Sequence, residues 1–274
     1  PKRVRVTMQA LSSSEPSIRF GAFLGVFLAM ALWELLAPRR AQAISRLQRW
    51  PGNLGLSVIN TLVLRILFPA AAVGAAIFAE SHGWGIFQVI NAPDVVAILG
   101  SVILLDLVIY LQHRLFHAVP LLWRLHRVHH TDLAFDVTTG VRFHPVEILL
   151  SMLIKIAAVV TLGAPAIAIL VFEVLLNATT MFNHANITLT RPLDRIVRLI
   201  VVTPDMHRVH HSVRREETNS NFGFSVPWWD WAFRTYRAQP ADGHDRMIIG
   251  VEKFRDPANL HLSRLLLQPV RPED

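Results

Sequence analysis

The sequence contains no cysteine and few charged residues: Asp, Glu, Lys and Arg make up only 17% of its 274 residues. Without cysteine the chain has no disulfide scaffold, and no thiolate can serve as a nucleophile or metal ligand. Soluble domains typically carry about 25% charged residues, whereas 52% of this chain is hydrophobic and its mean hydropathy is +0.39. This composition excludes a disordered chain and favours a membrane protein.

Positive charge exceeds negative charge by seven, from 27 Lys and Arg against 20 Asp and Glu. In an apolar chain such an excess more often marks the cytoplasmic face of a membrane protein than a nucleic-acid site. We therefore expect no nucleic-acid partner. Metal chemistry must rely on carboxylates and on the 13 histidines.

Apolar runs and their connections predict an all-α, integral membrane helical bundle of about four to five membrane helices with a helical cap. The runs cover residues 18–37, 54–79, 95–112, 146–162 and 165–182. The last two are each marginal for a full span, so this hairpin either crosses twice or dips into the membrane and returns. We divide the chain into a polar, disordered lead (1–17), two N-terminal transmembrane helices (18–92), a histidine-rich domain (93–237) and a peripheral, partly helical C-terminal segment (238–274).

The order of the runs predicts which segments share a side of the membrane. One histidine-rich stretch follows the third run and another follows the hairpin, so an even number of crossings separates them. The loop from Arg39 to Arg49 emerges on the same side, and the positive-inside rule makes that side cytoplasmic. The basic segment 1–17 then lies on the opposite side, against the rule. No organelle retention or transit signal is visible, which favours a bacterial inner membrane.

The histidines recur at helical spacing. His113 and His117 are four residues apart, so on a helix they project from one face. The sequence His-Arg-Val-His-His occurs twice and again puts its imidazoles on one face. These copies contain His126, His129 and His130, and His207, His210 and His211; His144 and His184 lie on the same predicted side of the membrane. The isolated His82, His244 and His261 fit ordinary surface or loop positions.

Ten imidazoles exceed the roughly four to six ligands of one ion and suit two ions. Zinc binds such ligands more tightly than Fe(II), so affinity does not identify the metal. Zinc would indicate a non-redox membrane lipid hydrolase or a structural site, and iron would indicate oxygen chemistry. A non-catalytic metal-binding membrane protein and histidines that contact lipid headgroups are further alternatives.

These motifs, in this order, resemble those of the fatty acid hydroxylase/sterol desaturase superfamily of integral membrane di-iron enzymes. The matching segments, from about residue 95 to 237, are Asp106-x3-Tyr110-x2-His113-Arg114-x2-His117, Leu122-Trp123-Arg124-x-His126-x2-His129-His130, Arg142-x-His144-Pro145, Asn183-His184, Thr203-Pro204-x2-His207-x2-His210-His211, and Asn221-Phe222-Gly223 with Trp229-Asp230-x2-Phe233-x-Thr235-Tyr236. Two positions depart from the pattern: Phe222 replaces the usual Tyr, and Arg234 stands where Gly is common. Neither residue is a metal ligand.

The resemblance implies a cytosolic cap in which all ten histidines hold two Fe ions, although Zn could replace iron in an isolated protein. It implies activation of O2 and attack on an unactivated C–H bond of a lipid that enters from the membrane, giving hydroxylation, desaturation or cleavage. Sterol, fatty acyl, carotenoid and ether lipid substrates all fit. The chain shows neither a dinucleotide fingerprint nor a haem segment, so we expect a separate electron donor, a ferredoxin or small cytochrome with its reductase.

Several further residues are candidates for supporting roles. Asp106 precedes His113 by two helical turns, so it is a candidate acceptor for a hydrogen bond from a ligand imidazole. Asp205 and Asp230 are weaker carboxylate candidates, and Asn183 and Asn221 fit either ligand binding or simple turns. Basic residues between the histidines suit anionic headgroups or an acidic electron donor: Arg114, Arg124, Arg127, Arg208, Arg214 and Arg215.

Overall fold

The computed structural model describes residues 2–272, with side chains from residue 15 onward. Within this part of the chain every regular element is a helix, and the β-structure is limited to two isolated bridges, Pro38–Ile187 and Ser212–Ile249. The long helices are α1 (Lys2–Leu36), α2 (Arg46–Leu67), α5 (Asp94–Ala118), α7 (Pro145–Leu162) and α8 (Ala166–Asn183). The predicted all-α fold is confirmed.

The shorter helices complete the chain. They are α3 (Ala71–Ser81), α4 (Ile86–Val89), α6 (Pro120–His130), α9 (Arg191–Val197), α10 (Pro204–His210), α11 (Arg215–Thr218), α12 (Trp228–Ala232), α13 (Gly243–Arg246) and α14 (Leu262–Leu267), with the 3-10 turns η1 (Thr139–Val141), η2 (Pro257–Leu260) and η3 (Gln268–Val270).

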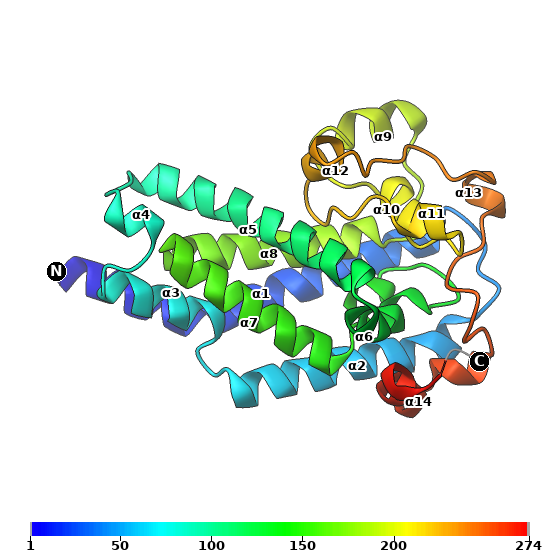
Figure 1. Cartoon of the computed structure of the whole chain (residues 1–274), viewed down its shortest axis with the longest axis horizontal. Helices are drawn as coiled ribbons and strands as arrows, with labels where there is room; N and C mark the ends of the chain where they lie inside the picture. The colour runs from blue at the N-terminus through cyan, green and yellow to red at the C-terminus, as the bar shows by residue number, and fades with distance from the viewer. Residues whose placement is uncertain (1, 273–274) are drawn as a thin grey trace.

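The long helices lie side by side as a bundle, and α6 and α9 to α14 gather at one end as a cap (Figure 1). The chain runs along α1 towards the cap, returns along α2 and α3, and comes back along α5. The α7–α8 hairpin makes one more excursion away from the cap and back. Both histidine-rich stretches therefore lie in the cap, as the predicted even number of crossings requires.

The outer surface of the bundle is apolar. Large side chains such as Leu28 on α1, Leu62 on α2 and Leu99 on α5 are exposed, which a bilayer tolerates and water does not. Among the described residues, five segments are long and apolar enough to cross a membrane: Glu15–Leu36, Arg46–Val89, Asp94–Ala118, Pro145–Leu162 and Ala166–Asn183. The protein is an integral membrane helical bundle. The hairpin helices have 18 residues each, or about 27 Å at 1.5 Å per residue, close to the thickness of the hydrocarbon core.

The core of the bundle lies between α3, α5, α7 and α8. Small residues of α3, including Ala72 and Ala76, are fully buried and belong to one apolar cluster with Leu105, Val159 and Phe172. Small side chains let helices approach closely in a membrane, where packing rather than water exclusion drives association.

The N-terminal half differs from the expected outline in two places. The run 54–79, expected to supply the second of the two N-terminal transmembrane helices, is divided: α2 ends at Leu67 and α3 begins at Ala71. Pro69 explains the break, because proline lacks a backbone N–H and forces the preceding residue out of the helical region. Accordingly, Phe68 has φ −132°. The polar lead 1–17 was expected to be disordered, whereas α1 already begins at Lys2.

A buried polar network joins the bundle to the cap. Arg49 on α2 is fully buried and donates to both carboxylate oxygens of Asp132 at 2.7 Å and to Asp136 at 2.6 Å. Asn53 donates to Asp132 at 3.0 Å and accepts from Arg142 at 2.8 Å. Buried charges are stable only when paired and hydrogen-bonded in this way. Arg49 is therefore a neutralised structural residue and not a free charge of the 39–49 loop.

The C-terminal segment, expected to be peripheral, packs against the body of the protein. Leu265 of α14 is fully buried in a cluster with Leu56 of α2 and Val128 of α6. The hydroxyl of Thr131, just beyond α6, donates to the side chain of Gln268 at 3.1 Å. This segment therefore supports the helix that carries one of the two His-Arg-Val-His-His sequences.

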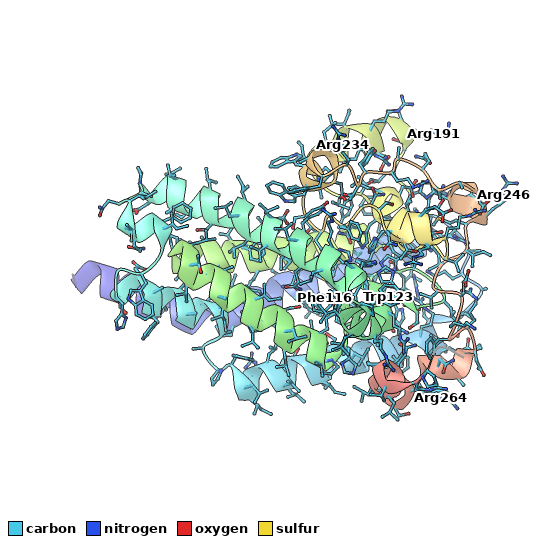
Figure 2. All side chains as sticks on the ribbon, in the orientation of Figure 1. Phe116, Trp123, Arg191, Arg234, Arg246 and Arg264 are labelled. Atoms are coloured by element: carbon cyan, nitrogen blue, oxygen red, sulfur yellow. The ribbon has the colours of Figure 1, made fainter. Side chains whose placement is uncertain are left out.

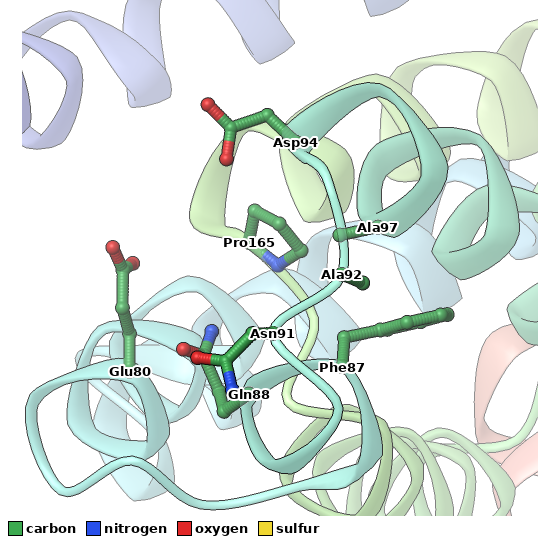
Figure 3. A pocket seen from close by; sticks show the side chains of 8 residues that line it. All are labelled: Glu80, Phe87, Gln88, Asn91, Ala92, Asp94, Ala97 and Pro165. Carbon is green, nitrogen blue, oxygen red and sulfur yellow. The ribbon is translucent and has the colours of Figure 1, made fainter.

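The end of the bundle opposite the cap holds a cavity of about 310 Å³ between α3, α4 and the start of α5 (Figure 3). Its polar lining residues are Glu80, Gln88, Asn91 and Asp94. It has acidic but no basic lining residues, in contrast to the arginine-rich cap.

Candidate metal centre

Nine of the ten predicted histidines converge inside the cap. They come from four places in the chain: the last two turns of α5, the last half of α6, the residue after α8, and α10 with the residue that follows it. Their rings are His113, His117, His126, His129, His130, His184, His207, His210 and His211. Figure 2 shows how densely side chains fill this end of the molecule, with Trp123 of α6 among them.

The nine rings form two adjacent groups, in each of which the candidate ligand atoms lie within 4.8 Å of one another. The five-histidine group contains His113, His117, His126, His130 and His210; the four-histidine group contains His129, His184, His207 and His211. Two ligands on opposite sides of one ion, each about 2.1 Å from it, would be about 4.2 Å apart. The separations in both groups thus suit one ion each.

In three of the nine rings a hydrogen bond to a backbone carbonyl fixes which nitrogen faces the centre. The Nδ1 atom of His113 lies 2.7 Å from the carbonyl of Phe222, and that of His210 lies 2.7 Å from the carbonyl of Ser220. His184 makes the same contact with its own helix, 2.8 Å from the carbonyl of Thr180. A carbonyl only accepts, so each of these Nδ1 atoms carries the proton and each Nε2 presents a lone pair.

In the five-histidine group these lone pairs face one another. The Nε2 of His113 is 3.0 Å from the Nε2 of His126 and 3.0 Å from that of His210. Both partner rings use their Nδ1 protons elsewhere, His126 on the carboxylate of Glu147 at 2.7 Å. With no proton between these nitrogens, their electron pairs repel. A cation at their centre removes the repulsion, so the donor set fits a metal ion.

The four-histidine group repeats this crowding around His184. Its Nε2 lies 3.2 Å from the Nε2 of His129 and 3.2 Å from that of His207. In addition, His130 and His211 are fully buried, and none of their ring nitrogens has a hydrogen-bond partner. A buried polar group without a partner costs about 1–3 kcal/mol. Coordination to a metal would satisfy one nitrogen of each ring.

The rings are also in the protonation state that ligation requires. Burial lowers the pKa of His184 and of His210 to about 3, despite the carbonyl hydrogen bonds that favour the charged form. Burial and the neighbouring imidazoles lower the pKa of His129, His130 and His211 well below the usual value. At neutral pH these rings are therefore neutral, as metal binding demands.

The structure places His144 outside both groups. It is the N-cap of α7: its Nδ1 accepts the backbone N–H of Val146 at 3.2 Å. Its Nε2 therefore carries the proton and donates to the carbonyl of Leu266 at 3.1 Å. Both nitrogens are occupied, so His144 shapes the start of the hairpin and holds the C-terminal segment.

The predicted carboxylates do not contact the histidine groups. Asp106 accepts a hydrogen bond from the indole of Trp229 at 2.9 Å, not from an imidazole. Asp205 pairs with Arg208 and with Arg39. Asp230 accepts the backbone N–H groups of Phe222 and Gly223 at 2.8 and 2.9 Å. Asp230 therefore acts indirectly. It fixes the loop whose Phe222 carbonyl accepts the hydrogen bond from His113.

The predicted asparagines also hold loops. Asn183 donates to the carbonyl of Phe224 at 2.7 Å. Asn221, with φ +51°, donates to the carbonyls of Met206 and Arg237 at 2.9 and 2.8 Å. These contacts fix the segment 220–224, which supplies carbonyl acceptors to both His113 and His210.

Two buried ionisable residues of the cap side were not identified from the sequence. Glu147, in the first turn of α7, is buried and orients His126; an ionisable residue at the start of an apolar run was the available signal. His244, expected at the surface, is buried, and its Nε2 lies 3.7 Å from Asp205. Its isolation in the sequence gave no indication of this.

Comparisons with known proteins agree with the geometry. A sequence model of the fatty acid hydroxylase family matches residues 98–235. The chain is 30% identical, over 232 residues and 80% of its length, to the ornithine lipid hydroxylase OlsE of Rhizobium tropici. It is 27% identical to the alkylglycerol monooxygenases of Homo sapiens and Caenorhabditis elegans, over 52% and 53% of its length.

The chain covers only part of these relatives: 66% of the Rhizobium protein, and 30% and 28% of the two animal proteins. The region shared with the human protein amounts to 146 residues. No solved structure matches the chain.

Proposed function

This chain belongs to the fatty acid hydroxylase family, and we propose that it is a membrane-bound, O2-dependent oxygenase that hydroxylates a C–H bond of a membrane lipid. The similar proteins are named a lipid hydroxylase and monooxygenases, which favours hydroxylation over desaturation. The observation that carries the proposal is the pair of buried histidine groups whose Nε2 lone pairs converge.

We propose that the five-histidine group and the four-histidine group each hold one iron ion. Bound there, two irons would supply the redox chemistry that activates O2 for insertion into a C–H bond. The carboxylate of Glu147 accepts a hydrogen bond from the Nδ1–H of His126. This contact fixes the tautomer of His126 and makes its Nε2 a stronger donor to a metal. The carbonyls of Phe222, Ser220 and Thr180 do the same for three other rings.

The surroundings of the rings exclude bulk water. Phe143 stacks on His129 at a centroid distance of 4.4 Å, and Phe224 lies 4.8 Å from His113. Phe135 lies 5.4 Å from His184. An apolar enclosure of this kind protects a strong oxidant from side reactions with solvent.

We propose that the cap faces the cytoplasm of a bacterial inner membrane. Exposed arginines such as Arg191, Arg234 and Arg246 belong to the cap (Figure 2), whereas the 80–93 connection at the opposite end contains no Lys or Arg. This asymmetry follows the positive-inside rule, to which the basic segment 1–17 is the exception. Electrons would then come from a cytoplasmic protein, a ferredoxin or a small cytochrome with its reductase.

Metal analysis and oxygen dependence test this proposal together. Protein expressed in metal-depleted medium and supplied with Fe(II) should retain two irons per chain and, with O2 and a reductant, should add one oxygen atom to a lipid in proteoliposomes. The same preparation kept anaerobic should form no product. Retention of zinc in place of supplied iron, or lipid turnover without O2, would instead indicate the zinc-dependent hydrolase.

A further inference from the structure

A cavity of about 430 Å³ opens in the cap beside the five-histidine group. Its lining includes His117 and Trp123, whose ring lies 5.0 Å from that of His117 and 5.3 Å from that of His130. His117 is the one residue among the nine that is not fully buried, yet both its ring nitrogens are inaccessible to solvent. His117 therefore borders the cavity while its ring nitrogens belong to the five-histidine group.

The mouth of the cavity is charged. Arg215 of α11 and Lys253 are exposed lining residues, and Glu252 is the acidic one. A deeper lining residue, Arg127, holds its guanidinium 4.8 Å from the ring of Phe254. The guanidinium of Arg127 is engaged by the carbonyls of Gln268 and Arg271. The mouth itself therefore carries two exposed cations against one carboxylate, which suits a polar group with a negative charge better than an alkyl chain.

The wall is fixed rather than loose. The backbone N–H of Gly250 donates to the carbonyl of His211 at 3.0 Å, and that of Val213 to the carbonyl of Ile248 at 2.9 Å. Gly250 has φ +105°, and a Cβ there would lie 3.2 Å from the carbonyl of Asp132. Glycine therefore allows the lining loop to pack closely against the segment after α6. This packing fixes the position of the charged mouth relative to the histidine group.

We propose that this cavity binds the polar, anion-bearing end of the substrate, so that the carbon hydroxylated is in or next to that polar group and not deep in an acyl chain. The proposal rests on the oxygenase function above. One O2, two electrons from a one-electron carrier protein and two protons convert the C–H bond to C–OH and one water. The recognised group can belong to a lipid headgroup or to a water-soluble molecule, because the cavity selects for charge.

Binding to the iron-loaded protein in detergent tests the site independently of turnover. Dihexanoyl phosphatidylserine should bind roughly tenfold more tightly than dihexanoyl phosphatidylcholine, which has the same chains and no net charge. The double variant Arg215→Glu/Lys253→Glu should lose this preference. Arg264→Glu, a control at an exposed arginine of α14 outside the cavity (Figure 2), should keep it. Equal affinity for the two lipids, or a preference that survives the double reversal, would overturn the proposal.

Competition and product analysis complete the test. Displacement of the serine lipid by O-phosphoserine would show that the charged group alone is recognised; displacement only by intact lipid would assign the site to a headgroup held in a membrane. Fragment mass spectrometry of the product should place the new hydroxyl in the polar fragment. A hydroxyl confined to acyl fragments overturns the placement but leaves the oxygenase intact. Charge-selective binding without any O2-dependent product rejects the oxygenase and leaves the binding site standing.

Discussion

The two His-Arg-Val-His-His segments have identical sequences but distribute their histidines in opposite ways. In α6 the first and fifth residues, His126 and His130, join the five-histidine group, and the fourth, His129, joins the other. At α10 the first and fifth residues join the four-histidine group, and the fourth, His210, crosses over. Each segment therefore contributes to both groups, in a two-to-one ratio that is reversed between them.

Helix geometry explains the exchange. At 3.6 residues per turn, positions i and i+4 differ by about 40° around the axis, whereas positions i+3 and i+4 differ by about 100°. One helix can therefore present two rings to one ion and the third to its neighbour. Each copy of the motif therefore supplies histidines to both groups, and neither copy builds one group alone.

Removing the crossing histidine from each segment should give the largest effect. His129→Ala leaves three rings in its group and should release that ion, whereas His210→Ala leaves four and should retain more metal. Both should lower turnover by more than about 100-fold, beyond the loss typical of residues that only orient ligands. Iron per chain from elemental analysis checks this, with the exposed His261→Ala as control. Unchanged iron in both variants would contradict ligation.

The support of the two segments also differs, because His126 contacts a carboxylate and His210 a backbone carbonyl. Glu147→Gln keeps an acceptor oxygen but removes the charge, so metal affinity or turnover should fall about 10- to 100-fold. Iron titration with a competing chelator measures it. Glu216→Gln, at an exposed position in α11, should behave as wild type. Wild-type affinity in Glu147→Gln would mean that the negative charge is dispensable.

The starts of the two helices predict a smaller difference. At α10 the Thr203 side chain accepts the N–H of Met206, whereas at α6 the N-cap Val119 has no such contact. Thr203→Ala should lower the free energy of unfolding by about 1 kcal/mol, and Val119→Ala by less than about 0.5 kcal/mol. Thermal unfolding in detergent measures both losses. Thr203→Ser keeps the hydroxyl acceptor, so its stability should stay close to that of the wild type. Equal losses at the two caps would contradict this account.

The smallest expected effect is a pH dependence beside α10. Burial lowers the pKa of His244 to about 4, from a usual value near 6.5. Between these values the unfolded chain binds a proton that the folded protein does not, so stability falls as the pH drops from 6.5 towards 4. His244→Gln should reduce this fall by a few degrees in Tm between pH 7 and pH 5. Parallel Tm curves for variant and wild type would remove His244 as a cause.

The sequence predicted the helical bundle, its topology and the gathering of nine histidines, because apolar length and helical spacing are local signals. It could not separate His144 from the others, since only the tertiary contacts with Val146 and Leu266 show that its nitrogens are occupied. It also missed Glu147, whose role depends on the close approach of α7 to α6. The assignment of each ring to a group required the rotation of α6 relative to α10, which spacing alone does not specify.

The pairing of Arg49 with Asp132 and Asp136 has a practical consequence. A shortened chain that began after α2 would retain both aspartates in its interior but would lack the guanidinium of Arg49 that pairs with them. Removing one partner of a buried ion pair typically costs about 3–5 kcal/mol, a large part of the stability of an ordinary domain. Removal of the first two long helices for crystallography or assay should therefore fail, and biochemical work on this enzyme has to keep α2 attached to the histidine-bearing portion.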